Sequence, residues 1–356
     1  MPFLKRRINQ WVLLLVCALA IRLSAIRQDW VENYYSTGIY PLISKITRYL
    51  FGWVPFSVGD IFYFFAGAWL LYRIFKGIQL LRSGHPAKTV IKSGLLWLVM
   101  ICLLVYISFN FLWGLNYNRK GIAWQMNLEV KDTATTSLVS MTALLRDHTN
   151  DWKPAESSKK PFSSVRVTSM SAYQQLQQSV SWLAYHPESV KPSLYGVLGN
   201  YMGYSGYYNP FSGEAQLNTH IPGFLVPFST CHEIAHQLGY AKENEANFVG
   251  YLAARESADS AMRYSAYLNM FLYANNELRY MDSTLAKENF EKLSVPVKKD
   301  LAEYRQFLII YEGPVEKFVD VFYHQFLKLN EQPAGRRTYN KVVLWLLAYY
   351  QQRGTI

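Results

Sequence analysis

Apolar residues are distributed differently in the first third of the chain and in the rest. Three apolar runs approach the length of a membrane-spanning helix, at residues 11–26, about 58–76 and about 93–114. The first run is short and is interrupted by Arg22, and no comparable run follows residue 120. The pattern therefore predicts a membrane anchor of three transmembrane helices in residues 1–115 and a soluble domain in residues 116–356.

In the second part of the chain, apolar residues recur mostly with helical spacing. This spacing predicts helices near residues 133–147, 169–185, 243–257, 259–281, 295–311, 314–330 and 338–352. The stretch between Tyr201 and Asn218 is rich in aromatic residues and glycine, with Asn209-Pro210-Phe211-Ser212-Gly213 in its middle, and it predicts a β-hairpin. The expected fold class is mainly α, with three transmembrane helices followed by a mostly helical domain that contains a small hairpin.

The basic residues predict an orientation in the membrane. They precede the first apolar run, and they fill the link between the second and third runs, which has no acidic residue: Lys5, Arg6, Arg7, then Arg73, Lys76, Arg82, Lys88 and Lys92. Both regions should face the cytoplasm. Because no small-x-small cleavage site follows the first run, we expect an uncleaved anchor. The expected location is the inner membrane, multi-pass, with a cytoplasmic N-terminus and a periplasmic soluble domain.

The net charge does not indicate nucleic-acid binding. The formal charge is +11, but the Lys and Arg residues are scattered and form no basic helix. Juxtamembrane cations such as Arg119 and Lys120 are better explained by anionic lipid headgroups. The expected partners are therefore membrane lipid and a peptide or protein substrate, and no nucleic acid. The three cysteines, Cys17, Cys102 and Cys231, indicate no disulfide framework.

The segment His232-Glu233-Ile234-Ala235-His236 has the spacing of a zinc hydrolase motif. Residues four apart lie on one face of a helix, so both imidazoles can bind one metal ion while Glu233 lies beside them. Ser229 and Thr230 stand where a helix N-cap is expected, and Gly239 is suited to end the helix. An alternative remains, in which Thr230 and Glu233 form a capping box and bind no metal.

A catalytic zinc site needs a third protein ligand, and an acidic cluster follows the motif directly. We expect Glu245 to be this ligand, because it belongs to an apolar segment that can form a second helix packed against the motif helix. Glu243 is the alternative, although it is expected in the turn between the two helices.

Three further segments are similar to the DUF3810 family of bacterial membrane proteins: Pro55-Phe56-Ser57-Val58-Gly59-Asp60, Trp113-Gly114-Leu115-Asn116-Tyr117 and Tyr208-Asn209-Pro210-Phe211-Ser212-Gly213-Glu214-Ala215. This resemblance spans nearly the whole chain and implies a zincin-like metallopeptidase domain. The triplet Glu245-Ala246-Asn247 also resembles the third-ligand segment of the ImmA/IrrE group of metallopeptidases, which implies a ligand role for Glu245.

The expected function is a membrane-anchored zinc metallopeptidase, with Zn²⁺ held by His232, His236 and Glu245 and with Glu233 as general base for the attacking water. The strand at 214–218 is the expected edge for pairing with substrate. The candidates for a second electrophile are Tyr208, His220, His324 and Tyr339. Two alternatives remain: a zinc-stabilised binding or envelope-assembly module without catalysis, and an intramembrane protease, which the distance of the motif from the apolar runs disfavours.

Overall fold

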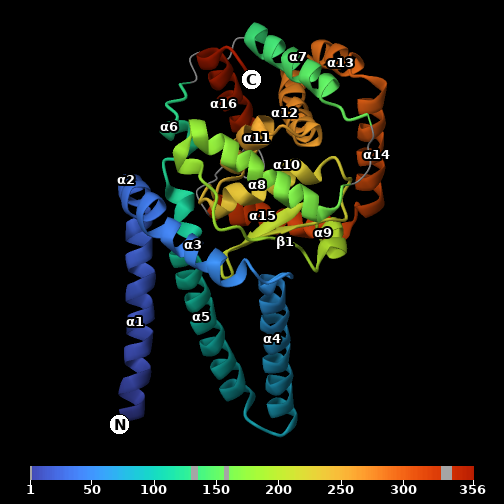
Figure 1. Ribbon diagram of the computed structural model, residues 1–356. Coiled ribbons are helices and arrows are strands. Elements are labelled where there is room, and N and C mark those ends of the chain that lie inside the picture. Colours follow the sequence, from blue (N-terminus) through green and yellow to red (C-terminus); the bar gives the residue numbers. More distant parts are fainter. Residues whose placement is uncertain (1, 130–134, 156–159, 330–338) are drawn as a thin grey trace.

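The computed structural model describes residues 2–129, 135–155, 160–329 and 339–356. Three long helices project from one side of a globular helical part (Figure 1). They are α1 (Pro2–Ala25), α4 (Val58–Arg82) and α5 (Ala87–Leu112). The fold is mainly helical with one small sheet, as the periodicity predicts.

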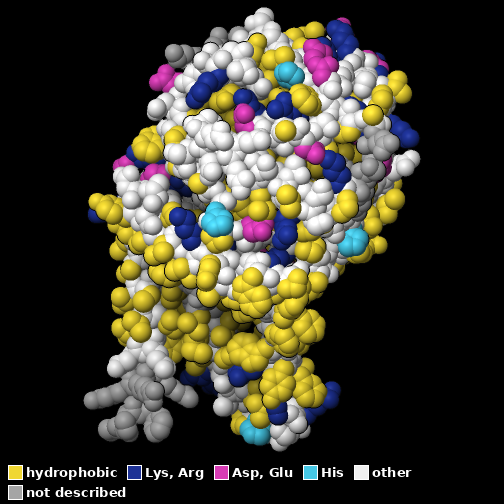
Figure 2. Space-filling view, in the orientation of Figure 1, with side chains coloured by type: hydrophobic (Ala, Val, Ile, Leu, Met, Phe, Trp, Pro, Cys, Tyr) yellow, Lys and Arg dark blue, Asp and Glu magenta, His cyan; other side chains and the backbone are white. Residues whose placement is uncertain are grey.

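The helices α4 and α5 are long and apolar enough to cross a membrane, and they cover the second and third predicted runs. The first run is part of a bent pair, in which Asn9–Ala25 and Gln28–Phe51 meet at 96°. The described residues therefore contain two such helices, or three if the bent pair counts as one span. The side chains on these helices are largely exposed, and they form the apolar lower half of the space-filling view (Figure 2).

Beyond the bend, the chain runs beneath the globular part as α2 (Gln28–Trp30), the π-helical η1 (Val31–Ile39) and α3 (Tyr40–Phe51). Residues four apart share a helix face, and in α3 the face with Tyr40, Ser44 and Arg48 is buried. The opposite face exposes large apolar side chains, at Leu42, Ile46, Tyr49 and Leu50. The helix α3 thus lies between the globular core and an apolar outer surface.

The core of the globular part surrounds α10 (Val226–Gln237) and α11 (Glu243–Glu256), which pack against each other. Gly250 permits this close approach, because a Cβ atom there would lie 2.9 Å from the backbone nitrogen of His232. The surrounding elements are η2 (Gly114–Asn118), α6 (Ile122–Gln125), α7 (Thr135–Asp151), α8 (Phe162–Ser179), η3 (Ser181–Leu183), α9 (Gly196–Met202), α12 (Ser260–Met281), α13 (Ser283–Glu291), α14 (Val295–Tyr311), α15 (Pro314–Leu329) and α16 (Tyr339–Arg353).

The sheet lies on the side of the globular part that faces the projecting helices (Figure 1). Its strands are β1 (Val190–Pro192), β2 (Gly206–Asn209) and β3 (Glu214–Leu217), in the order β1-β3-β2. The hairpin of β2 and β3 confirms the predicted turn. The expected edge strand at 214–218 is wrong, however, because β3 pairs with β1 on one side and with β2 on the other. Within the described residues, β2 is the strand with an open edge beside the cavity described below.

Candidate metal centre

His232, His236 and Glu243 form a compact group in which one ligand atom of each residue lies within 4.8 Å of the others. Nε2 of His232 is 3.3 Å from Oε2 of Glu243, and Nε2 of His236 is 3.7 Å from Oε1 of the same carboxylate. The three side chains therefore converge on one point, as the histidine spacing predicts for the two imidazoles. Two imidazoles and one carboxylate are a donor set that zinc binds in catalytic sites.

The turn after the motif helix orients His236. Gly239 adopts a left-handed φ of +88°, so that Gly239 N–H bonds to the carbonyl of His236 and Tyr240 N–H bonds to that of Ala235. This turn brings the Tyr240 carbonyl oxygen to 2.7 Å from Nδ1 of His236. A proton held on Nδ1 by this carbonyl leaves the lone pair of Nε2 facing Glu243. The predicted end of the helix at Gly239 is confirmed, and the turn also fixes the imidazole tautomer.

The structure brings Glu243, and not Glu245, to the histidines. The second helix begins at Glu243, so Glu243 and Glu245 point to nearly opposite sides of its first turn. The Glu245 carboxylate is buried against the backbone of Gly121, with Oε1 3.7 Å from Nζ of Lys242. The expectations that Glu245 lies beside the histidines and that Glu243 falls in a turn are therefore wrong.

Glu233 is buried beside the histidines, and its Oε2 atom has no hydrogen-bond partner among the residues that the structure describes. Burial raises the pKa of Glu233 to about 8. A desolvated carboxylate without a partner binds a proton more readily than an ordinary glutamate, which suits a group that exchanges protons with water. The capping-box alternative is wrong, because α10 begins at Val226 and Thr230 Oγ1 donates to the Val226 carbonyl at 2.8 Å within the helix.

The two imidazoles differ in proton affinity. Burial and the neighbouring His232 lower the pKa of His236 to about 4, so His236 is neutral near pH 7. Burial also acts to lower the pKa of His232, but the carboxylates of Glu243 and Glu233 outweigh it and raise that pKa. The carboxylates thus attract positive charge to His232, and a metal ion would compete with a proton for that position.

A cavity of about 710 Å³ adjoins the group and includes His232, Glu233, His236 and Glu243 in its wall. Other parts of the wall come from β2, α9, α15 and the upper ends of α4 and α5. A second cavity, of about 270 Å³, also includes His232 and Glu243 in its wall. The group is therefore reachable by molecules larger than water.

A family model described as a protein of unknown function, DUF3810, matches residues 35–347. The chain belongs to the DUF3810 family. No curated protein and no solved structure matches this DUF3810 chain. The family resemblance of the three sequence segments is thus confirmed, and the chemistry of the chain has to be inferred from its own residues.

The three segments that resemble the DUF3810 family meet around the motif helix. Trp113 donates its indole N–H to the His236 carbonyl at 3.0 Å, and Tyr40 donates its hydroxyl to the Gln237 carbonyl at 2.8 Å. The Glu214 carboxylate accepts hydrogen bonds from Val58 N–H and Gly59 N–H at the start of α4, at 3.1 and 2.6 Å. Residues on both sides of the predicted boundary at 115 therefore hold the motif helix and the sheet in place.

Of the four candidates for a second electrophile, Tyr208 lies in the wall of the large cavity. His220 and His324 are not among the wall residues of either cavity, and the side chain of Tyr339 lies outside the described part of the chain. Tyr117 also lines the large cavity, close enough to Glu243 that burial and this carboxylate raise its pKa well above the usual value. Tyr117 is not among the site residues that the sequence predicts, although it lies in one of the three family segments.

Proposed function

We propose that this DUF3810 protein is a membrane-anchored, zinc-dependent metallopeptidase. The observation that carries the proposal is the convergence of His232, His236 and Glu243 on one point beside a Glu233 oxygen that no described residue bonds. The donor set and the fixed tautomer of His236 fit zinc, because zinc ligands in proteins are oriented by such hydrogen bonds to their distal nitrogen.

In the proposed reaction, His232, His236 and Glu243 hold the metal and Glu233 moves the proton. When bound, zinc would supply a Lewis acid that makes water a better nucleophile and polarises the substrate carbonyl. Glu233 would accept the proton of the attacking water and donate it to the leaving nitrogen. The hydroxyls of Tyr117 and Tyr208, whose pKa values burial raises well above the usual range, stay protonated and are candidates to donate a hydrogen bond to the carbonyl oxygen.

The strand β2 supports a peptide as substrate. In an antiparallel pair every second residue directs its backbone groups away from its partner, so the open edge of β2 can pair with an extended chain. This strand passes close to the general base, since a Cβ atom on Gly206 would lie 2.8 Å from Oε1 of Glu233. A peptide bound along β2 would therefore run close to Glu233.

The proposed location is the inner membrane, with the N-terminus in the cytoplasm and the metal centre in the periplasm. The basic link between α4 and α5 lies at the ends of these helices farthest from the globular part, where the positive-inside rule places the cytoplasm. The metal centre then lies on the opposite side of the membrane.

The test uses the full-length protein in detergent, because residues before the predicted boundary hold the motif helix. Zinc content by mass spectrometry should be about one ion per chain and should be lost in Glu243→Ala but kept in Glu245→Ala. Glu233→Gln should keep zinc and abolish cleavage of a peptide library. Cleavage by Glu233→Gln would refute the assigned base, and zinc binding without any cleavage by the wild type would favour the non-catalytic binding module.

A further inference from the structure

The large cavity extends from the metal centre to the membrane-spanning helices. One end of its wall contains the histidines and the two glutamates, and the other end contains Tyr63 of α4 with Val105 and Phe109 of α5. A molecule that fills the cavity would therefore touch the metal centre and the two apolar helices at once.

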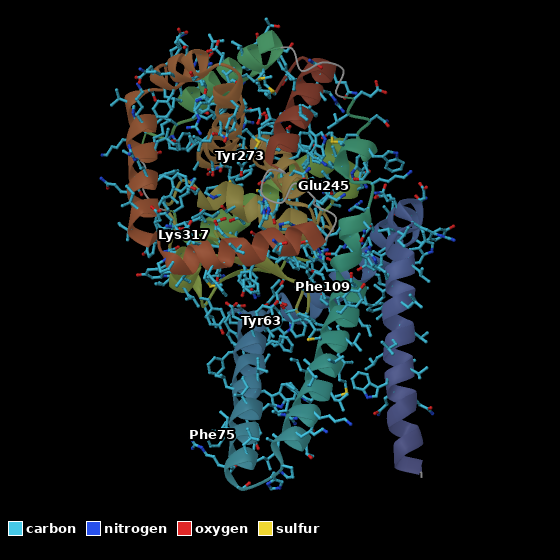
Figure 3. All side chains as sticks on the ribbon, turned by 180° about the vertical axis from the view of Figure 1, so that it is seen from behind. Tyr63, Phe75, Phe109, Glu245, Tyr273 and Lys317 are labelled. Atoms are coloured by element: carbon cyan, nitrogen blue, oxygen red, sulfur yellow. The ribbon has the colours of Figure 1, made fainter. Side chains whose placement is uncertain are left out.

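The helices α4 and α5 are close at the ends joined by their link and stand apart beneath the globular part, where they form a fork (Figure 3). Each arm is fixed to a different element. Tyr63 on α4 stacks on Tyr207 of β2 with ring centroids 6.3 Å apart, and Phe109 on α5 contacts Phe326 of α15 at 6.1 Å. The cavity thus lies between two anchored arms and beneath α15.

The fork reaches into the outer part of the hydrocarbon core of the bilayer. Residues 93–112 of α5 carry no charged side chain, and about 20 such residues cross the hydrocarbon core. Val105 lies seven residues before Leu112, the end of this stretch, which corresponds to roughly 10 Å along the helix. Val105 is 51% exposed although it lines the cavity, so the cavity wall at this point continues into the lipid-facing surface.

The second cavity, which shares His232 and Glu243 with the large one, has a more polar wall. Its lining residues include Asn200, Ser229, Asn247, Asn269 and Glu316. The two cavities share His232, Glu243 and the segment Gly203–Ser205. The metal centre therefore lies between an apolar space at the membrane and a more polar space within the globular part.

The geometry points to a membrane-inserted polypeptide as the substrate, with its apolar segment in the fork between α4 and α5 and its scissile bond just outside that segment. This inference rests on the proposed peptidase function and adds the substrate class. A polypeptide fits better than a lipid because the open edge of β2 runs along the same cavity. The polar continuation of the substrate would enter the second cavity.

Binding can be tested separately from cleavage in vesicles of phosphatidylethanolamine and phosphatidylglycerol. The probe is a peptide mixture in which a Leu/Ala segment of about 20 residues precedes ten or so randomised positions. The photocrosslinking residue benzoylphenylalanine replaces Val105 in the Glu233→Gln protein, and the control carries it at Leu104, which is 41% exposed and is not in the cavity wall. We expect crosslinking at position 105 to exceed that at 104 by about tenfold, because binding in the fork holds the probe against position 105. Equal crosslinking at the two positions, or none, would overturn the inference.

Cleavage is then compared between this anchored mixture and the same randomised peptides without the apolar segment. We expect the wild type to cut the anchored peptides about tenfold faster or more, since the fork adds binding energy. Val105→Trp should lower the ratio of anchored to free peptide cleaved, whereas Leu104→Trp should not. Equal cleavage of free and anchored peptides, dependent on Glu233, would refute the substrate class and leave the peptidase function intact. Crosslinking at 105 without cleavage of either mixture would refute the peptidase function and leave the binding site intact.

Discussion

Replacement of Gly239 by alanine should damage the proposed metal centre without changing any of its ligands. At a φ of +88°, an alanine is disfavoured by about 1–2 kcal/mol. Its Cβ atom would also lie 2.8 Å from Cε1 of Tyr40, whose hydroxyl is bonded to the Gln237 carbonyl, so the ring cannot move freely. This overpacking adds about 1–3 kcal/mol. The total expected loss of stability is therefore about 2–5 kcal/mol.

The same substitution should weaken zinc binding, because a shifted turn moves the Tyr240 carbonyl away from Nδ1 of His236. Loss of such an orienting contact costs about 10–100-fold in metal affinity. The assays are zinc titration against a competing chelator and the melting temperature of the full-length protein in detergent. Unfolding entropy scales with chain length, so 1 kcal/mol corresponds to about 1.3 °C for this chain, and the melting temperature should fall by about 3–7 °C.

Gly84→Ala is the matched control for the backbone cost alone. Gly84 has a φ of +84°, and a Cβ atom there would meet nothing within 4 Å. This variant should lose only about 1–2 kcal/mol and keep its zinc affinity. If Gly239→Ala melts and binds zinc like Gly84→Ala, the assigned role of the turn in orienting His236 is wrong.

Three further substitutions test how the motif helix is held. Gly250→Ala would place a Cβ atom 2.9 Å from the His232 backbone nitrogen, so it should lower the stability of the folded protein by about 1–3 kcal/mol and lower its zinc content. The control is Gly77→Ala, which has open space around it and should melt like the wild type. Trp113→Phe removes the indole donor to the His236 carbonyl and should lower the stability of the folded protein by about 1–3 kcal/mol, measured as a lower melting temperature. An unchanged melting temperature would show that this hydrogen bond does not contribute to stability. Glu214→Gln keeps the shape of the side chain but removes its negative charge from the start of α4, and it should lower the stability of the folded protein by about 1–2 kcal/mol in the same measurement. Equal stability would show that this charge does not stabilise the start of α4.

The sequence predicts the features that depend on local pattern. The motif helix ends at Gly239 because only the residues next to it determine that turn, and the apolar runs become α4 and α5 because length and composition are local properties. The hairpin follows from Asn209-Pro210-Phe211-Ser212-Gly213 in the same way.

The features that sequence analysis missed depend on helix phase or on distant partners. Each residue along a helix turns the side chain by about 100°, so a small error in the start of α11 exchanges Glu243 and Glu245. The strand β3 is central because β1, a strand of three residues that begins 24 positions earlier, pairs with it, and no local pattern predicts such a distant partner.

The same long-range contacts make the proposed metal centre depend on the long apolar helices and on the segments next to them. The carbonyl groups at the end of a helix have no partner within the helix, and at the end of α10 they are bonded by Trp113, which directly follows α5, and by Tyr40 and Ser44 of α3. In the sheet, the Glu214 carboxylate of β3 accepts hydrogen bonds from the first N–H groups of α4. A movement that separates α4 from α5 would therefore pull on β3 and on the end of the motif helix together. These hydrogen bonds connect both arms of the fork to the elements that carry Glu233 and the residues proposed to hold the metal.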